Sequence, residues 1–211
     1  MSLPTTSLFD FACRLGYRSE PPKLSGDLSD WGSEYLLPHL SSLDGEPRFA
    51  DVYGAWNEDW LAFAVCVTGK RRIQVDPRQF WAKDSVEIWL DTRDVRTAHR
   101  LSRYCHQFYF LPKGGGRGGA APVGRQAAST PAPQADPDEI RVASTTARDG
   151  YIIEAIIGAS ALSGFDVGEC NRLGFNYHIN DTELGTQYWL WGKRFPLHAD
   201  PSLWGTLELV K

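Results

Sequence analysis

The stretch DSVEIWLD (residues 84–91) shows the clearest alternation of apolar and polar side chains in the sequence. Successive side chains of a β-strand point to opposite faces of its sheet. The apolar residues that share one face are Val86, Ile88 and Leu90. Glu87 and Trp89 share the other face. The pattern therefore predicts a strand with one packed face and one polar face that carries an aromatic ring.

Similar segments occur along the rest of the chain and indicate the fold class. Runs rich in β-branched and aromatic residues, separated by polar or glycine turns, cover 51–56, 60–68, 105–111, 140–146, 151–157, 173–179, 187–191 and 204–210. No long amphipathic helical pattern interrupts them. About nine or ten short strands with turns at short spacing predict an all-β fold, an antiparallel β-sandwich of the immunoglobulin or jelly-roll kind.

The 211 residues are sufficient for one domain. We expect residues 1–23 to form an N-terminal lead-in that ends at two prolines, and residues 24–211 to form the sandwich. Residues 112–138 consist mainly of Gly, Ala, Pro, Gln and Ser and contain almost no large apolar side chain. Such a composition does not repay the entropy of ordering, so it predicts a flexible insertion between strands.

Charge and composition exclude several classes of protein. The net charge is −4, so the chain has no basic surplus for nucleic acid. No apolar stretch approaches the roughly 20 residues that a membrane-spanning helix needs. The four cysteines show no CxxC spacing, which favours reduced thiols. The sequence as given predicts a cytoplasmic protein, or a secreted or periplasmic one if a signal peptide has been removed.

No enzyme signature is present. The sequence lacks GxSxG, HExxH and a phosphate-binding loop, because the glycine run 114–119 has no Lys-Ser/Thr after it. Asp91 and Asp94 lie in an arginine-rich turn that favours their ionised forms, which is the wrong state for a general acid. We therefore expect a non-catalytic protein without a cofactor.

The segment from Asp91 to His106 invites a metal interpretation because it contains two histidines and Cys105. Cys105 and His106 are neighbours in a predicted strand, so their side chains point to opposite faces and do not share one ion without a bulge. The structural alternative pairs Arg100 or Arg103 with one of the aspartates and holds a long connection against the sheet. We expect no metal site.

Six short segments, in order over residues 24–210, carry a resemblance to a known family. They are GDLSDW (26–31), WNEDWL (56–61), WAKDSVEI (81–88), GYIIEAI (150–156), GFNYHIND (174–181) and DPSLWG (200–205). In these segments the chain resembles carbohydrate-binding module family 9 and the wider DOMON-like β-sandwiches. The resemblance implies a non-catalytic sandwich that holds the end of a glycan between two aromatic rings.

The resemblance also implies site residues. Trp81 corresponds to the first ring, and Glu87 to an acidic partner in the following strand. Other positions depart from the family: His198 stands where the second ring is expected, and Tyr109 and Leu111 stand in the strand where the family offers an Arg and an Asn. The predicted ligand site is therefore Trp81, Glu87, Tyr109 and His198, with a glycan or a glycan-like molecule as ligand.

Two other functions remain open from the sequence. The chain is an intracellular sandwich that has lost sugar binding and acts through protein contacts, or it carries a metal or haem. Some DOMON-like sandwiches bind haem with a Met and a His, but this chain has no Met after position 1 and no CxxCH. Trp81 itself has a structural alternative, as a lid over the edge of the core.

Overall fold

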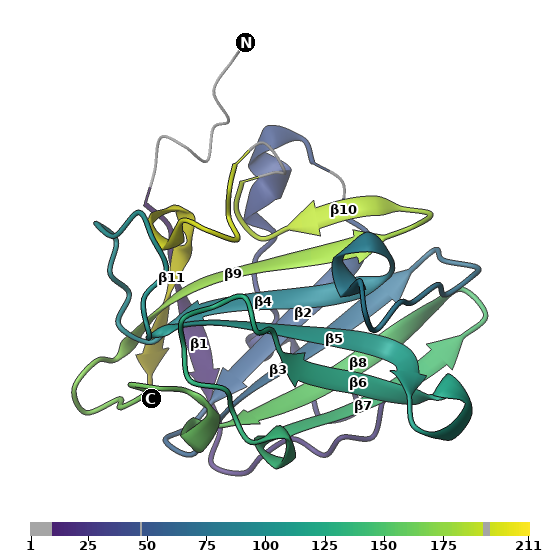
Figure 1. Cartoon of the computed structure of the whole chain (residues 1–211), viewed down its shortest axis with the longest axis horizontal. Helices are drawn as coiled ribbons and strands as arrows, with labels where there is room; N and C mark the ends of the chain where they lie inside the picture. Colours follow the sequence, from purple (N-terminus) through teal and green to yellow (C-terminus); the bar gives the residue numbers. More distant parts are fainter. Residues whose placement is uncertain (1–9, 47, 192–194) are drawn as a thin grey trace.

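A computed structural model describes residues 10–46, 48–191 and 195–211 of the chain (Figure 1). Its strands are β1 (Ala12–Tyr17), β2 (Ala50–Trp56), β3 (Trp60–Thr68), β4 (Ser85–Asp91), β5 (Cys105–Gly115), β6 (Ala121–Gln126), β7 (Ile140–Ala147), β8 (Gly150–Gly158), β9 (Arg172–Asp181), β10 (Gly185–Tyr188) and β11 (Gly205–Val210). The helical segments are short 3-10 turns: η2 (Ser33–Tyr35), η3 (Leu40–Asp44), η4 (Phe80–Ala82), η5 (Arg117–Gly119), η6 (Pro137–Glu139), η7 (Ala159–Ala161) and η8 (Pro201–Leu203). Within the described ranges, no helix is long and apolar enough to cross a membrane.

The strands form one sheet in the order β6-β5-β4-β9-β11-β1-β2-β3-β8-β7, and β10 pairs with β9. The all-β class is confirmed. A purely antiparallel arrangement is wrong, because β1 runs parallel to both of its neighbours, β11 and β2. The chain enters the sheet at β1 and leaves it at β11 in the same direction, so the two terminal strands meet as a parallel pair.

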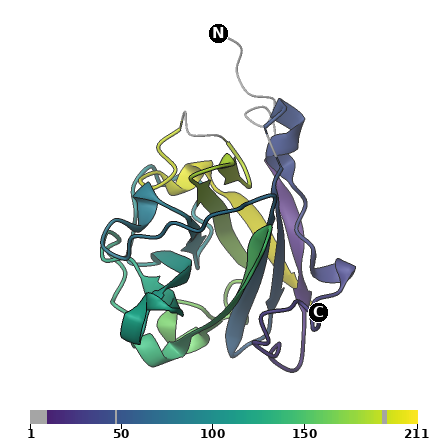
Figure 2. The same ribbon diagram turned by 90° about the vertical axis from the view of Figure 1, so that its right-hand side faces the viewer.

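The sheet bends until its two ends approach each other (Figure 2). A Cβ atom at Gly124 of β6 would lie 3.2 Å from the side chain of Ile140 at the start of β7, and equally close to Phe110 of β5. The missing side chain at Gly124 therefore allows this close approach. The two layers expected of a sandwich are thus halves of one strongly curved sheet that is almost a barrel.

The main core lies between these two halves. Phe63 of β3 and Phe175 of β9 stack across it with ring centroids 5.5 Å apart. The three apolar residues of β4 that the alternation predicted for the packed face are buried in this core: Val86, Ile88 and Leu90. The opposite face of β4 carries a smaller apolar cluster that includes Trp89 and Trp204. One face of β4 therefore packs in the main core, and the other packs in a smaller cluster on the opposite side of the sheet.

The predicted N-terminal lead-in is wrong where the structure describes it. Residues 12–17 form β1, between β11 and β2 in the sheet, and residues 1–9 lie outside the described part of the chain. Leu15 is buried in the main core, and its carbonyl accepts a hydrogen bond of 3.0 Å from Trp56 Nε1. Leu15 is the one buried residue of β1, so the strand has no strong apolar alternation to identify it.

The interpretation of residues 112–138 as an insertion without regular structure is also wrong. This segment contains the end of β5, the whole of β6, and the turns η5 and η6. Backbone hydrogen bonds of β6 to β5 define the strand, so it needs few large side chains. Small residues such as Val123, Ala127 and Ala132 are buried here. Their small size gives close packing and hides the segment from a composition-based interpretation.

The Asp91–His106 segment is held by partners other than those expected. Asp94 pairs with Arg172 Nε at 3.2 Å rather than with Arg100 or Arg103. Asp91 accepts hydrogen bonds from two backbone N–H groups of its own turn. Among the described residues, no group of three or more His, Cys, Asp or Glu side chains gathers as metal ligands would. Two carboxylates of the segment itself, those of Asp91 and Asp94, therefore hold this connection in place.

Candidate ligand-binding site

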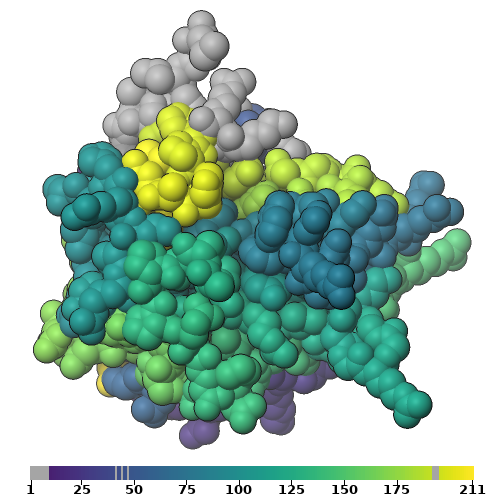
Figure 3. Space-filling view, in the orientation of Figure 1, coloured from purple at the N-terminus to yellow at the C-terminus, as the bar shows by residue number. Residues whose placement is uncertain are grey.

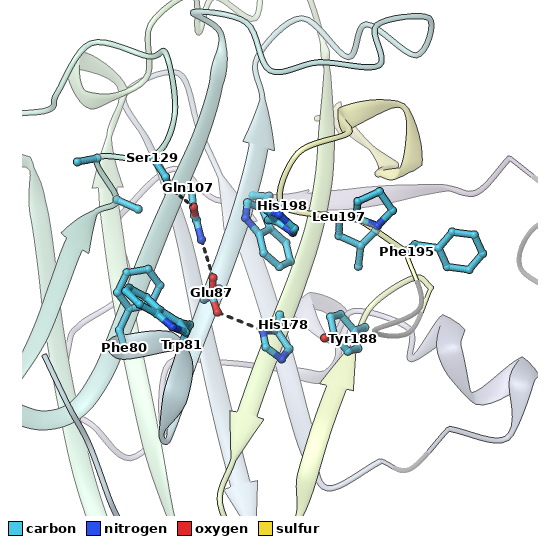
Figure 4. A pocket seen from close by; sticks show the side chains of 14 residues that line it. Phe80, Trp81, Glu87, Gln107, Ser129, His178, Tyr188, Phe195, Leu197 and His198 are labelled. Atoms are coloured by element: carbon cyan, nitrogen blue, oxygen red, sulfur yellow. Dashed lines mark hydrogen bonds and ion pairs between the residues drawn. The ribbon is translucent and has the colours of Figure 1, made fainter. Parts of the chain in front are cut away.

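A pocket of about 840 Å³ lies on the face of β4, β5, β9 and β10 that points away from the main core (Figure 4). Three further segments complete its walls: the turn η4, residues 127–129 after β6, and residues 195–198 before η8. In the space-filling view, the blue, teal and yellow regions that contain these segments border one another on a single face (Figure 3). The walls therefore come from distant parts of the sequence, while adjacent strands form the floor.

Strand register aligns the polar residues of the floor. Glu87 of β4 is paired with Tyr109 of β5 on one side and with His178 of β9 on the other. His178 is in turn paired with Tyr188 of β10. Directly paired residues of neighbouring strands point to the same face, so these side chains form one row across the sheet.

A chain of hydrogen bonds connects the floor. Ser129 Oγ donates to Gln107 Oε1 at 2.8 Å, and Gln107 Nε2 donates to Glu87 Oε2 at 2.6 Å. The other oxygen, Glu87 Oε1, lies 3.1 Å from His178 Nδ1. Glu87 is buried, yet each of its oxygens has a partner, which is the arrangement that a buried carboxylate requires.

Aromatic side chains form the walls. Trp81 lies at the rim with 58% of its surface exposed, and it contacts the ring of Phe80 edge-on at 5.0 Å. Phe80 stacks flat on Tyr109 with centroids 4.0 Å apart. Tyr188 stacks on His178 at 4.4 Å. Trp81 is thus an exposed ring on a rigid aromatic support.

Burial has raised the pKa of two tyrosines in this region. The pKa of Tyr188 is raised to about 12, first by burial and then by the negative charges of Glu87 and Glu46. Burial also raises the pKa of Tyr109, partly offset by Arg125. Both phenols therefore stay protonated at neutral pH and keep their hydroxyl hydrogens.

Three of the four residues predicted for the site line this pocket: Trp81, Glu87 and His198. Figure 4 shows Trp81 and His198 on opposite sides of Glu87. Tyr109 does not line the pocket, because Phe80 covers its ring. The structure thus brings together three residues that lie far apart in the sequence and places the fourth behind them as a support.

Several lining residues were not predicted, among them Gln107, Ser129, His178 and Tyr188. The alternation of GFNYHIND places His178 on the polar face of its strand, so a signal for it exists in the sequence. Ser129 has no comparable signal, because it lies in the segment whose composition predicts disorder. Its position depends on β6 and on the turn that follows.

The model of the family described as "Carbohydrate family 9 binding domain-like" matches residues 42–211. The chain belongs to this family. The predicted resemblance to carbohydrate-binding module family 9 is thereby confirmed. No curated protein matches the sequence.

Solved structures share the fold of this family 9 chain. A family 9 carbohydrate-binding module from Caldicellulosiruptor kristjanssonii in complex with glucose has a TM-score of 0.66 at 19% identity, over 94% of this chain and 95% of that one. A family 9 module from the same organism in complex with cellotriose has a TM-score of 0.65 at 18% identity, over 94% of this chain and 93% of that one. A putative carbohydrate-binding protein from Bacteroides uniformis gives 0.59 at 13%, over 95% and 99%. The likeness extends over nearly the whole of each chain.

Proposed function

We propose that the protein is a non-catalytic module that binds a glycan in this pocket, with one sugar ring against the exposed face of Trp81. The observation that carries the proposal is the half-exposed indole of Trp81 beside a floor of buried, hydrogen-bonded polar groups. The hydroxyl groups of the sugar would face this floor, and His198 would close the opposite side.

The chemistry of a sugar suits such a site. One face of a pyranose ring consists of C–H groups and packs on an aromatic plane, whereas its hydroxyls need directional partners to replace water. A pocket of about 840 Å³ is within the usual range for small ligands. The solved family 9 structures in complex with glucose and with cellotriose support the same class of ligand.

The carboxylate inventory supports a binding role rather than hydrolysis. Glycoside hydrolysis ordinarily uses a pair of Asp or Glu residues that flank the scissile bond. Among the described residues that line the pocket, Glu87 is the one carboxylate, and both of its oxygens are already engaged. The pocket therefore holds its polar groups in place for contact.

The Trp81→Ala substitution tests the proposal. Calorimetric titration should show saturable binding of a sugar from a panel that includes cellotriose, glucose and other glycans. The affinity should weaken about tenfold or more in Trp81→Ala, because the stacking surface is lost. Trp81→Phe keeps a ring and should retain part of the affinity. Leu43→Ala removes another exposed apolar side chain, one outside the pocket, and serves as the control.

The two negative outcomes have separate meanings. Equal affinities of the wild type and Trp81→Ala for a sugar would move the binding site elsewhere. Absence of binding to every glycan of the panel would overturn the proposal. It would favour the alternative, a sandwich that has lost sugar binding and acts through protein contacts. Trp81→Ala should unfold at nearly the wild-type temperature, because its ring is largely exposed.

A further inference from the structure

Two buried polar atoms of residues that line the pocket have no hydrogen-bond partner among the described residues. They are Trp89 Nε1 of β4 and His178 Nε2 of β9. Both residues line the pocket, and their rings lie parallel with centroids 6.2 Å apart. Buried polar groups in proteins are usually paired, and leaving one unpaired costs on the order of 1–3 kcal/mol. These two atoms belong to adjacent rings that line one pocket, so they are the unpartnered atoms nearest to a bound ligand.

The hydrogen-bond chain of the floor fixes the chemical character of His178. An ionised carboxylate accepts hydrogen bonds and does not donate them. In the neutral form of His178 the hydrogen lies on Nδ1, because this atom faces Glu87 Oε1 at 3.1 Å. Its Nε2 atom then carries a lone pair and acts as an acceptor. The Nε1–H group of Trp89 is always a donor.

The same chain engages Glu87 on both sides. Gln107 Nε2 donates to one oxygen and His178 Nδ1 to the other, and the side chain is almost completely buried. The amide of Gln107 has a fixed orientation, because its Oε1 accepts from Ser129. Glu87 is therefore held to orient its neighbour, as the partner carboxylates of many functional histidines are.

We propose that His178 Nε2 and Trp89 Nε1 form an acceptor and donor pair that reads hydroxyl groups of the bound sugar, and that Glu87 is the positioning residue that sets the tautomer of His178. This inference rests on the proposed function and names the groups that determine specificity. A sugar hydroxyl both donates and accepts, so it matches either atom. An alkyl or deoxy position has no hydroxyl, so it offers neither a donor to His178 Nε2 nor an acceptor to Trp89 Nε1.

The experiment combines removal of single ligand hydroxyls with substitution of His178, in the manner of a double-mutant cycle. Affinities for methyl glucoside and its monodeoxy derivatives are measured with the wild type and with His178→Phe, which keeps a flat ring against Tyr188 but lacks Nε2. Removal of one hydroxyl should weaken the affinity of the wild type about tenfold, the value of one hydrogen bond. The same removal should not weaken the affinity of His178→Phe any further. His99→Phe, a substitution of an exposed histidine outside the pocket, should behave as the wild type does.

A second measurement does not depend on whether a His178 variant folds. In ¹⁵N NMR spectra of the wild type, the Nδ1 atom of His178 should be protonated and Nε2 unprotonated. Addition of methyl glucoside should shift both the Nε2 signal and the indole N–H signal of Trp89. Glu87→Gln should mix the two tautomers and lower the affinity, a spectroscopic change that a merely structural role for Glu87 would not produce.

The outcomes separate this inference from the proposed function. Deoxy derivatives that cost the wild type and His178→Phe the same, or sugar binding that leaves both ring signals unmoved, would overturn the inference while sugar binding stands. Absence of binding by every sugar would overturn the proposed function itself.

Discussion

His106 of β5 is a completely buried imidazole with incomplete hydrogen bonding. Its Nδ1 atom has no partner among the described residues, and its Nε2 atom lies 3.5 Å from the carbonyl oxygen of Ser163. Burial lowers the pKa of His106 to about 4, because the interior disfavours the charged ring. In the unfolded chain, the ring returns to its ordinary pKa of about 6.5.

This difference predicts acid sensitivity. Between pH 6.5 and pH 4 the unfolded state binds a proton that the folded state refuses, so the free energy of unfolding falls as the pH falls. At pH 5 the loss is about 2 kcal/mol relative to pH 7. Urea unfolding at both values should show this loss in the wild type, with that part missing in His106→Phe. An identical pH dependence in the two proteins would contradict the assignment.

At the same scale, the sequence predicts some site residues and not others. Strand alternation places Glu87 on the polar face of its own strand, and the family resemblance of the segment WAKDSVEI (81–88) identifies Trp81. His178 lies on the polar face of a predicted strand, but only the pairing of β4 with β9 places it beside Glu87. Register between strands 91 residues apart has no local signal in one sequence.

At the scale of elements, Lys70 connects three parts of the sheet. It follows β3, and its Nζ atom lies 3.0 Å from Asp84 Oδ1, just before β4, and 3.0 Å from Asp181 Oδ1 at the end of β9. All three side chains are fully buried. Burial alone would lower the pKa of Lys70, but hydrogen bonds and charge from the two carboxylates outweigh it and raise that pKa.

Removal of this ammonium should therefore destabilise the fold strongly. Lys70→Met leaves two buried carboxylates without their cation, which typically costs about 3–5 kcal/mol. Arg71→Met, at the exposed neighbouring position, should change the free energy of unfolding by less than about 0.5 kcal/mol. Chemical denaturation of both variants checks the difference. Equal stabilities would show that Lys70 does not hold these elements together.

The elements also show where composition misleads. The sequence predicts the hairpin of β2 and β3 to within one residue, because its strands are rich in large apolar residues and its turn is polar. β1 and β6 were missed, because neighbouring strands hold them through the backbone and few of their side chains are large and buried. A strand that depends on its neighbours leaves little trace in its own sequence.

At the scale of the whole molecule, curvature creates the site. Bending the sheet encloses the main core on one face and leaves the other face of β4, β5 and β9 outward. The segments before and after the strands then build walls on this outward face, so that Trp81 and His198 border one pocket. A strand pattern predicts the two faces, but only the closed topology shows which segments border them.

The most direct test of the central claim is a titration that observes Trp81 itself. The chain has eight tryptophans, so its NMR spectrum contains a small set of indole N–H signals, and Trp81→Phe identifies the one from Trp81. Addition of cellotriose should shift that signal saturably, while the signals of Trp31 and Trp60 in a separate apolar cluster stay in place. Saturable binding that moves Trp31 or Trp60 and leaves Trp81 unchanged would contradict the account.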